Sequence, residues 1–132
     1  MSGDVSRIKI EFALEGLGNV PGELVRFLSP RTAEALLRAM PMHGRAATWK
    51  EEVYFETSLK MGLEKSKSTV ESGTIAYWPM GSALCIFFGK TPVSKGDEIR
   101  PASAVNIIGK VVGDCRLLKR VKDGEEITIR RY

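Results

Sequence analysis

Few side chains in this sequence could carry acid–base, nucleophilic or metal chemistry. There is one histidine, His43, and there are two cysteines, Cys85 and Cys115, too few for the usual four Cys or His ligands of a zinc site. Any Ser–His or Cys–His nucleophile would have to use His43, which we expect in a solvated loop. Ser82 has no histidine near it in the sequence. We therefore expect no metal, no cofactor and no hydrolase site.

Three glutamates gather in one predicted strand region. Glu52 and Glu56 share a face of a regular strand, and Glu51 precedes them. A paired-carboxylate or metal role is open. We favour a solvent-facing sheet edge, because charges there oppose unwanted strand pairing. Lys110, inside another predicted strand, could bind an anion or extend into solvent.

Composition predicts one soluble domain over residues 1–132, with 43% hydrophobic residues and a net charge of +4. Basic and acidic residues alternate, as in KRVKDGEEITIRR, so we expect no nucleic-acid partner. No apolar run approaches the roughly 20 residues of a membrane helix, and the N-terminus lacks a signal-peptide pattern. We expect a cytoplasmic protein whose two cysteines are buried free thiols.

The elements that must position these residues are mostly short strands. Ile8, Ile10, Phe12 and Leu14 alternate with charged residues, which is typical of a half-buried strand. GLGN and the Pro21-Gly22 pair predict turns, before a hairpin partner at 22–28. Further strands are expected at 46–60 (one long or two short), 74–78, 83–88, 105–112 and 126–131, with loops at 61–73 (mobile around 65–68) and 89–104.

Two short helices are expected between these strands. Ser29 can cap the first helix and Pro30 suits its first position, with Pro41 as its stop. Asp114 can cap the second, which would run through Val121. About eight short strands and one or two helices favour a closed or nearly closed antiparallel barrel. The run ALCIFF indicates a strand that is covered on both faces.

The segment GTIAYWPMGSALCIFFGKTP, with VNIIGKVVGD and the closing KDGEEITI, resembles the small prokaryotic cyclophilin-like family. The resemblance runs from Arg7 to the end of the chain and implies a mainly β fold, the cyclophilin-type closed antiparallel β-barrel. One departure from the family pattern is Ala104, where a proline is common. More distantly, the chain is similar to true cyclophilins, which are peptidyl-prolyl isomerases.

The more distant similarity places a candidate groove but not its catalytic groups. In true cyclophilins an arginine in the pattern FHRVI donates to the prolyl amide, and the matching position here falls close to Glu56. A carboxylate accepts hydrogen bonds and cannot replace a guanidinium. The resemblance aligns the groove glutamine, phenylalanine and histidine with Ala83, Cys85 and Val105, and it aligns a groove-lining position with Trp78. Trp78 could also simply plug a barrel face.

These observations predict a ligand-binding groove lined by Glu56, Trp78, Ala83, Cys85 and Val105. The function that we favour is a peptide- or ligand-binding module without efficient prolyl isomerase activity. The alternatives are a divergent isomerase, another enzyme that uses the same groove, or a structural partner in a complex. A guanidinium in the groove would distinguish enzyme from binder, and Arg45 would have to fold back to supply it. A peptide or protein partner is possible, and the oligomeric state stays open.

Overall fold

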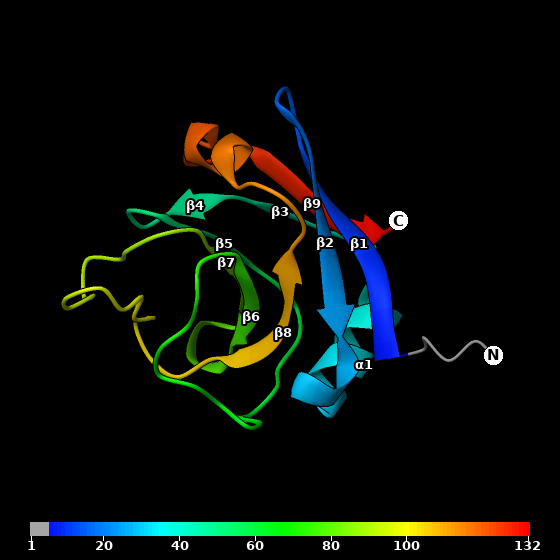
Figure 1. Cartoon of the computed structure of the whole chain (residues 1–132). Coiled ribbons are helices and arrows are strands. Elements are labelled where there is room, and N and C mark those ends of the chain that lie inside the picture. The colour runs from blue at the N-terminus through cyan, green and yellow to red at the C-terminus, as the bar shows by residue number, and fades with distance from the viewer. Residues whose placement is uncertain (1–5) are drawn as a thin grey trace.

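The computed structural model describes residues 6–132, which form nine strands, one α-helix and short 3-10 helices (Figure 1). The strands are β1 (Arg7–Leu14), β2 (Gly18–Val25), β3 (Met42–Arg45), β4 (Ala47–Thr48), β5 (Glu52–Glu56), β6 (Thr74–Trp78), β7 (Ala83–Phe87), β8 (Asn106–Val111) and β9 (Glu126–Arg131). The helices are α1 (Pro30–Ala39), η2 (Arg26–Leu28), η3 (Pro79–Gly81) and η4 (Arg116–Arg120). None of the described helices is long and apolar enough to cross a membrane.

All nine strands form one antiparallel sheet that curls into a nearly closed barrel. The strand order is β3-β9-β1-β2-β8-β6-β7-β5-β4, so β3 and β4 are the two edges. The barrel comes together where β3 lies against β5. Gly44 permits this approach, because a Cβ atom at that position would lie 2.7 Å from the Phe55 ring. The predicted antiparallel barrel is confirmed, with nine strands in place of about eight.

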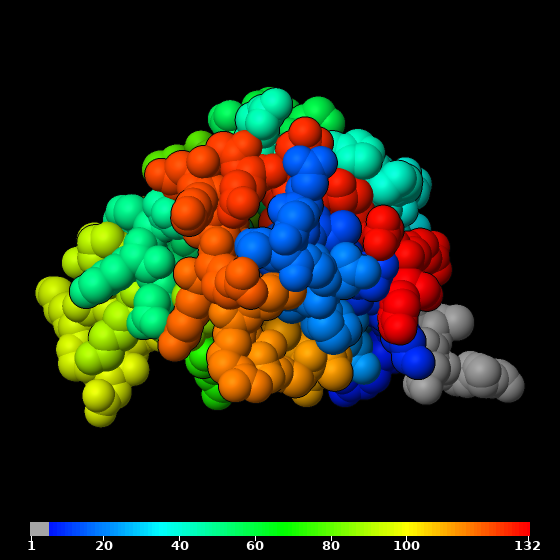
Figure 2. All heavy atoms as spheres, turned by 90° about the horizontal axis from the view of Figure 1, so that it is seen from above, coloured from blue at the N-terminus to red at the C-terminus, as the bar shows by residue number. Residues whose placement is uncertain are grey.

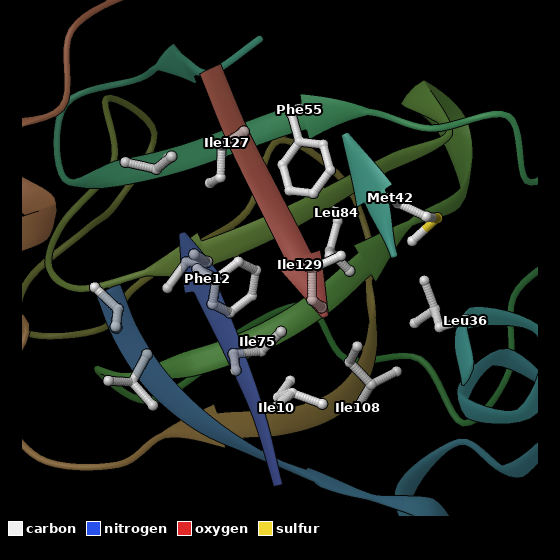
Figure 3. Packing of buried hydrophobic residues seen from close by; sticks show 14 of the residues in the cluster. Ile10, Phe12, Leu36, Met42, Phe55, Ile75, Leu84, Ile108, Ile127 and Ile129 are labelled. Carbon is white, nitrogen blue, oxygen red and sulfur yellow. The ribbon is translucent and has the colours of Figure 1, made fainter. Parts of the chain in front are cut away.

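The barrel interior is a continuous apolar core. Residues Ile10, Phe12, Ile75, Leu84 and Ile129 point toward one another from four strands, β1, β6, β7 and β9 (Figure 3). They are fully buried, and burying one such side chain contributes about 1.5–3 kcal/mol. Helix α1 completes this core by packing its apolar face against it through Ala33, Leu36 and Leu37.

A second, smaller cluster lies on the outer face of β6 and β7. It consists of Val70, Ala76, Cys85, Phe87, Ile99 and Val105. The segments between β5 and β6 and between β7 and β8 cover this face. They are joined by isolated β-bridges, in which Lys67 pairs with Val105 and Val70 pairs with Ile99. The 89–104 segment projects from the side of the molecule opposite β1 (yellow in Figures 1 and 2). Every residue of β7 is therefore buried, as ALCIFF predicted.

The loop between β5 and β6 fastens the start of α1. The Glu64 carboxylate accepts hydrogen bonds from the backbone N–H of Arg31 (2.9 Å) and Thr32 (2.8 Å) and from the Thr32 hydroxyl (2.8 Å). Asn106, fully buried on β8, accepts from the Glu64 N–H and donates to Thr32 and to the Gly62 carbonyl. This loop was predicted to be mobile around 65–68, yet it is hydrogen-bonded on either side of Ser66, at Lys65 and Lys67.

The predicted cap of α1 is wrong in its chemistry, although Pro30 does begin the helix. Ser29 stands at the cap position but makes no side-chain capping bond. Its hydroxyl donates instead to the Ile107 carbonyl at 2.8 Å, which ties the helix start to β8. Glu64 satisfies the free amides that Ser29 leaves. The second predicted helix is the 3-10 helix η4, whose cap position is Cys115. Asp114, one residue earlier, accepts from the Arg116 N–H, and η4 ends at Arg120, one residue short of the prediction.

Other boundaries differ from the sequence-based expectation in the first half of the chain. Strand β2 begins at Gly18, so Pro21 and Gly22 lie inside a strand, and residues 26–28 form η2. The turn is at 15–17. The region expected at 46–60 holds β4 and β5, and β3 precedes it.

Candidate functional site

An enclosed pocket of about 180 Å³ lies on the outer face of β5 and β7. Its walls are largely aromatic and apolar: Trp49, Tyr54, Trp78, Phe87, Pro101, Ala102 and Val105, with Glu52 and Cys85 as the remaining lining residues. Pockets that hold whole drug-sized ligands run from about 300 to 1,000 Å³. This pocket therefore suits one side chain or a small molecule.

Trp78 is the wall between this pocket and a neighbouring one. Its ring meets the Tyr54 ring edge-to-face, with centroids 6.4 Å apart and planes at 85°. Its indole N–H donates to the Ser103 hydroxyl at 2.6 Å, which links the end of β6 to the 89–104 segment. The backbone of Gly81 packs directly against the indole, so closely that a Cβ atom at this position would overlap the ring. Trp78 is thus held in place from three sides while part of its surface stays exposed.

The neighbouring pocket is wider, more open and more polar. It has a volume of about 570 Å³ and is lined by Arg45, Ala47, Tyr54, Phe55, Glu56, Trp78, Gly81 and Ala83. Arg45, the last residue of β3, lines this pocket, and its guanidinium donates to the Gly124 carbonyl at 3.0 Å, outside the lining. A basic residue and the exposed acid Glu56 therefore line one hollow beside Trp78.

The five predicted groove residues all fall in these two pockets. Trp78, Cys85 and Val105 line the enclosed pocket, and Glu56, Trp78 and Ala83 line the open one. Trp78 belongs to both, so the five residues form one continuous surface, which we call the outer groove.

Glu52 is where the sequence-based interpretation is wrong. It was expected on a solvent-facing edge, but β5 pairs with both β4 and β7 and is no edge, and Glu52 is only 5% exposed. Its even-numbered neighbours Tyr54 and Glu56 share its face, which alternation along a strand could have indicated. Glu56 is exposed, as predicted. Sequence reasoning missed Glu52, Tyr54 and Trp49 as groove residues.

Burial dominates the electrostatics of the enclosed pocket. Desolvation raises the pKa of Glu52 from 4.5 to about 7, and the neighbouring Cys85 thiol opposes this only in part. Desolvation, together with the Glu52 charge, raises the pKa of Cys85 well above its usual value. Cys85 is therefore a neutral thiol near pH 7, and Glu52 is poised between its charged and neutral forms.

The other candidates from the sequence, His43, Ser82 and Lys110, each contact different residues. His43 lies in β3, not in a loop, and its Nδ1 is 2.8 Å from the Thr128 hydroxyl. The Ser82 hydroxyl, which a hydrolase would pair with a histidine, accepts from the Lys60 ammonium group at 3.2 Å. Lys110 is exposed and lines an open hollow of about 580 Å³ that also holds acidic residues. Across residues 6–132, no three His, Cys, Asp or Glu side chains gather as a metal site.

Comparison with known proteins agrees with the barrel. A family model described as "Cyclophilin-like" matches residues 6–130. The solution structure of a hypothetical protein from Archaeoglobus fulgidus is similar over 100% of both chains, with 39% sequence identity and a TM-score of 0.84. No curated protein matches the chain.

Proposed function

Because this chain belongs to the cyclophilin-like family, we propose that it is a peptide-binding barrel whose ligand lies in the outer groove and that it lacks efficient prolyl isomerase activity. The observation that supports this is the pair of adjoining pockets on either side of Trp78. One is enclosed, largely apolar and sized for a single side chain. The other is open and carries both signs of charge.

A short extended peptide matches this combination better than a compact small molecule does. A side chain can enter the enclosed pocket between Tyr54 and Trp78. The neighbouring peptide groups then lie over the open pocket, where a carbonyl can accept from Arg45 and an amide N–H can donate to Glu56. Trp78 offers a fixed aromatic surface, the kind of residue that dominates peptide interfaces.

Both tryptophans of the chain, Trp49 and Trp78, line the enclosed pocket, so intrinsic fluorescence reports directly on it. We expect proline-containing and other short peptides to change this fluorescence. Amide chemical shifts should change around Trp78, Cys85 and Val105. The variants Trp49→Phe and Trp78→Phe assign the signal to each ring. Shift changes scattered over the surface, with unchanged fluorescence, would refute the groove as the binding site.

A divergent prolyl isomerase is the second candidate, and Arg45 is the observation that favours it. Arg45 lines the open pocket from β3, although nothing in the linear sequence places it near Trp78. A donor of this kind can stabilise a rotated prolyl amide, whose uncatalysed barrier is about 18–20 kcal/mol. Arg45 already donates to the Gly124 carbonyl, which limits its freedom to serve a ligand.

A protease-coupled isomerisation assay separates the two candidates. We expect the rate to stay at background for the unmodified protein. A catalysed rate well above background that disappears in Arg45→Ala and survives in Arg130→Ala would replace the binding proposal with the isomerase. Arg130 is the matched control, because it pairs with Glu11 across β9 and β1, away from the groove.

We also propose a reducing compartment such as the cytoplasm. Both cysteines, Cys85 and Cys115, are free. Cys85 is fully enclosed and neutral, and burial together with Asp114 raises the pKa of Cys115. Such thiols suit an environment that keeps cysteines reduced. A free-thiol titration of protein purified without reductant, native and unfolded, would find two thiols.

A further inference from the structure

Glu52 is a buried acid whose side chain faces a pocket. It is 5% exposed and forms part of the wall of the enclosed pocket, together with Trp49, Tyr54 and Trp78. Glutamate is rarely this buried unless an opposite charge or several hydrogen bonds compensate for the loss of water. The position therefore calls for a partner.

Within residues 6–132 no such partner is present. The ion pairs of the described chain involve other acids: Glu11, Glu23, Glu34, Glu98 and Asp114. The polar group that acts on the Glu52 carboxyl is the Cys85 thiol, a weak donor. The described residues also lack a cluster of three metal-ligating side chains, so Glu52 is not part of a built metal site.

The other walls of the pocket are suited to a positive charge. Aromatic faces attract ammonium groups, tryptophan most strongly, at about 6 Å or less from the ring centre. Four aromatic rings with this capacity, Trp49, Tyr54, Trp78 and Phe87, line the same pocket as the carboxylate. Trp78 is fixed by Ser103 and by the edge-to-face contact with Tyr54, so this wall is pre-formed.

We propose that the enclosed pocket binds an alkylammonium group, with Glu52 as its counter-ion and the rings of Trp49, Tyr54 and Trp78 around it. The group is supplied by a lysine side chain of a bound peptide or by a small free amine. This inference rests on the proposed function, since it names the side chain that the outer groove selects. The chain itself carries a net charge of +4, so attraction of a cation here has to come from the pocket.

The affinity for such a ligand depends on pH in a defined direction. Burial raises the pKa of Glu52 to about 7, and an ammonium group pairs only with its charged form. The ionisable groups that face Glu52 are Cys85 from β7 and Tyr54 from β5, and burial raises the pKa of both. Pro101, Ala102 and Val105, which close the pocket, do not ionise. Affinity therefore increases from pH 5.5 to pH 8 and then levels off.

The test compares four probes by tryptophan fluorescence: n-butylammonium, n-butanol, and two peptides that differ only in one lysine or norleucine. At pH 8 we expect the amine and the lysine peptide to bind at least about tenfold more tightly than their neutral counterparts, a difference of about 1.4 kcal/mol. Glu52→Gln should remove this preference and the pH dependence. Glu15→Gln removes an exposed charge from the turn between β1 and β2, outside both pockets, and should retain both.

The outcomes separate this inference from the proposed function. Equal or tighter binding of the norleucine peptide overturns the ammonium pocket while the peptide groove stands. Binding of the lysine peptide supports a peptide source, and binding of n-butylammonium alone supports a free amine. Absence of binding by all four probes, with unchanged amide shifts, overturns both proposals. Should Glu52→Gln fail to fold, the wild-type pH profile alone decides: a flat profile for the amine refutes the role of Glu52.

Discussion

Replacing Glu52 by glutamine should make the free protein more stable above neutral pH. Glutamine has nearly the same shape, so the packing of the pocket is kept while the ionisable group is lost. In the native state burial holds the pKa of Glu52 at about 7, against 4.5 for a solvated glutamate in the unfolded chain. That difference, about 2.5 pH units at about 1.36 kcal/mol each, corresponds to about 3 kcal/mol.

The direction follows from proton binding. Between pH 4.5 and 7 the folded state holds a proton on Glu52 that the unfolded chain has released. Stability from this group is therefore complete below pH 4.5 and is lost as pH increases through about 7. Glutamine has no such loss. The stability of Glu52→Gln relative to wild type should increase by about 3 kcal/mol from pH 4.5 to pH 8.

Urea unfolding of both proteins at intervals from pH 4.5 to 8.5 measures this difference. Other groups titrate in both proteins, so their contributions cancel when one curve is subtracted from the other. Glu56→Gln controls for the loss of one negative charge on the same face of β5. A flat difference curve for Glu52→Gln would show that Glu52 is solvated in the native state, and the buried-acid argument would be wrong. Proteins are typically stabilised by about 5–15 kcal/mol, so a change of about 3 kcal/mol in the free energy of unfolding is readily measured.

Three further predictions follow from contacts outside Glu52. Gly81→Ala should displace the Trp78 ring, cost about 1–3 kcal/mol and shift the fluorescence emission, because its Cβ overlaps the indole; an unchanged spectrum with unchanged peptide binding would contradict this. Glu64→Ala should cost about 1–2 kcal/mol by urea unfolding, since it removes three hydrogen bonds at the start of α1; a loss below 0.3 kcal/mol would mean that water replaces the cap. Asn106→Leu should cost about 3 kcal/mol or more, because the buried Thr32 hydroxyl, the Gly62 carbonyl and the Glu64 N–H all lose a partner, and hydrogen exchange in α1 should accelerate with it.

The sequence predicted correctly those elements in which the spacing of apolar residues alone determines which side chains are buried. The strand Glu126–Arg131 has the predicted bounds, because alternating side chains divide cleanly between core and solvent. Pro30 at the first helical position and the apolar stripe that follows it define α1 equally well. The run ALCIFF is buried on both sides because the second cluster covers its outer face.

Pro21 shows where a local rule fails for a physical reason. A proline inside a strand removes one ladder hydrogen bond, which is why it suggested a turn. The Pro21 carbonyl accepts from the Val112 N–H, so the backbone nitrogen of Pro21 also faces β8. It does so just beyond the last residue pair of the β2–β8 ladder, Gly22 with Val111. A missing N–H at that point leaves the β2–β8 ladder intact.

Glu64 and Arg45 could not be placed from the sequence because their partners are distant along it. Glu64 caps amides at Arg31 and Thr32, about thirty residues earlier, and no local motif encodes such a contact. Arg45 reaches the open pocket because β3 lies against β5 where the barrel nearly closes. Both depend on how the whole sheet curls.

Burial of Glu52 destabilises the fold at alkaline pH, and the proposed binding of an ammonium group explains why an acid stands at this position. An apolar residue at this position would fill the same space without a loss of about 3 kcal/mol at alkaline pH. The segment that closes the pocket through Pro101 and Val105 also positions Ser103, which holds Trp78. The cover that desolvates the acid is thus the one that orders the aromatic wall. A bound ammonium group would supply the opposite charge that Glu52 lacks in the free protein, so above pH 7 the ligand should stabilise the fold against unfolding.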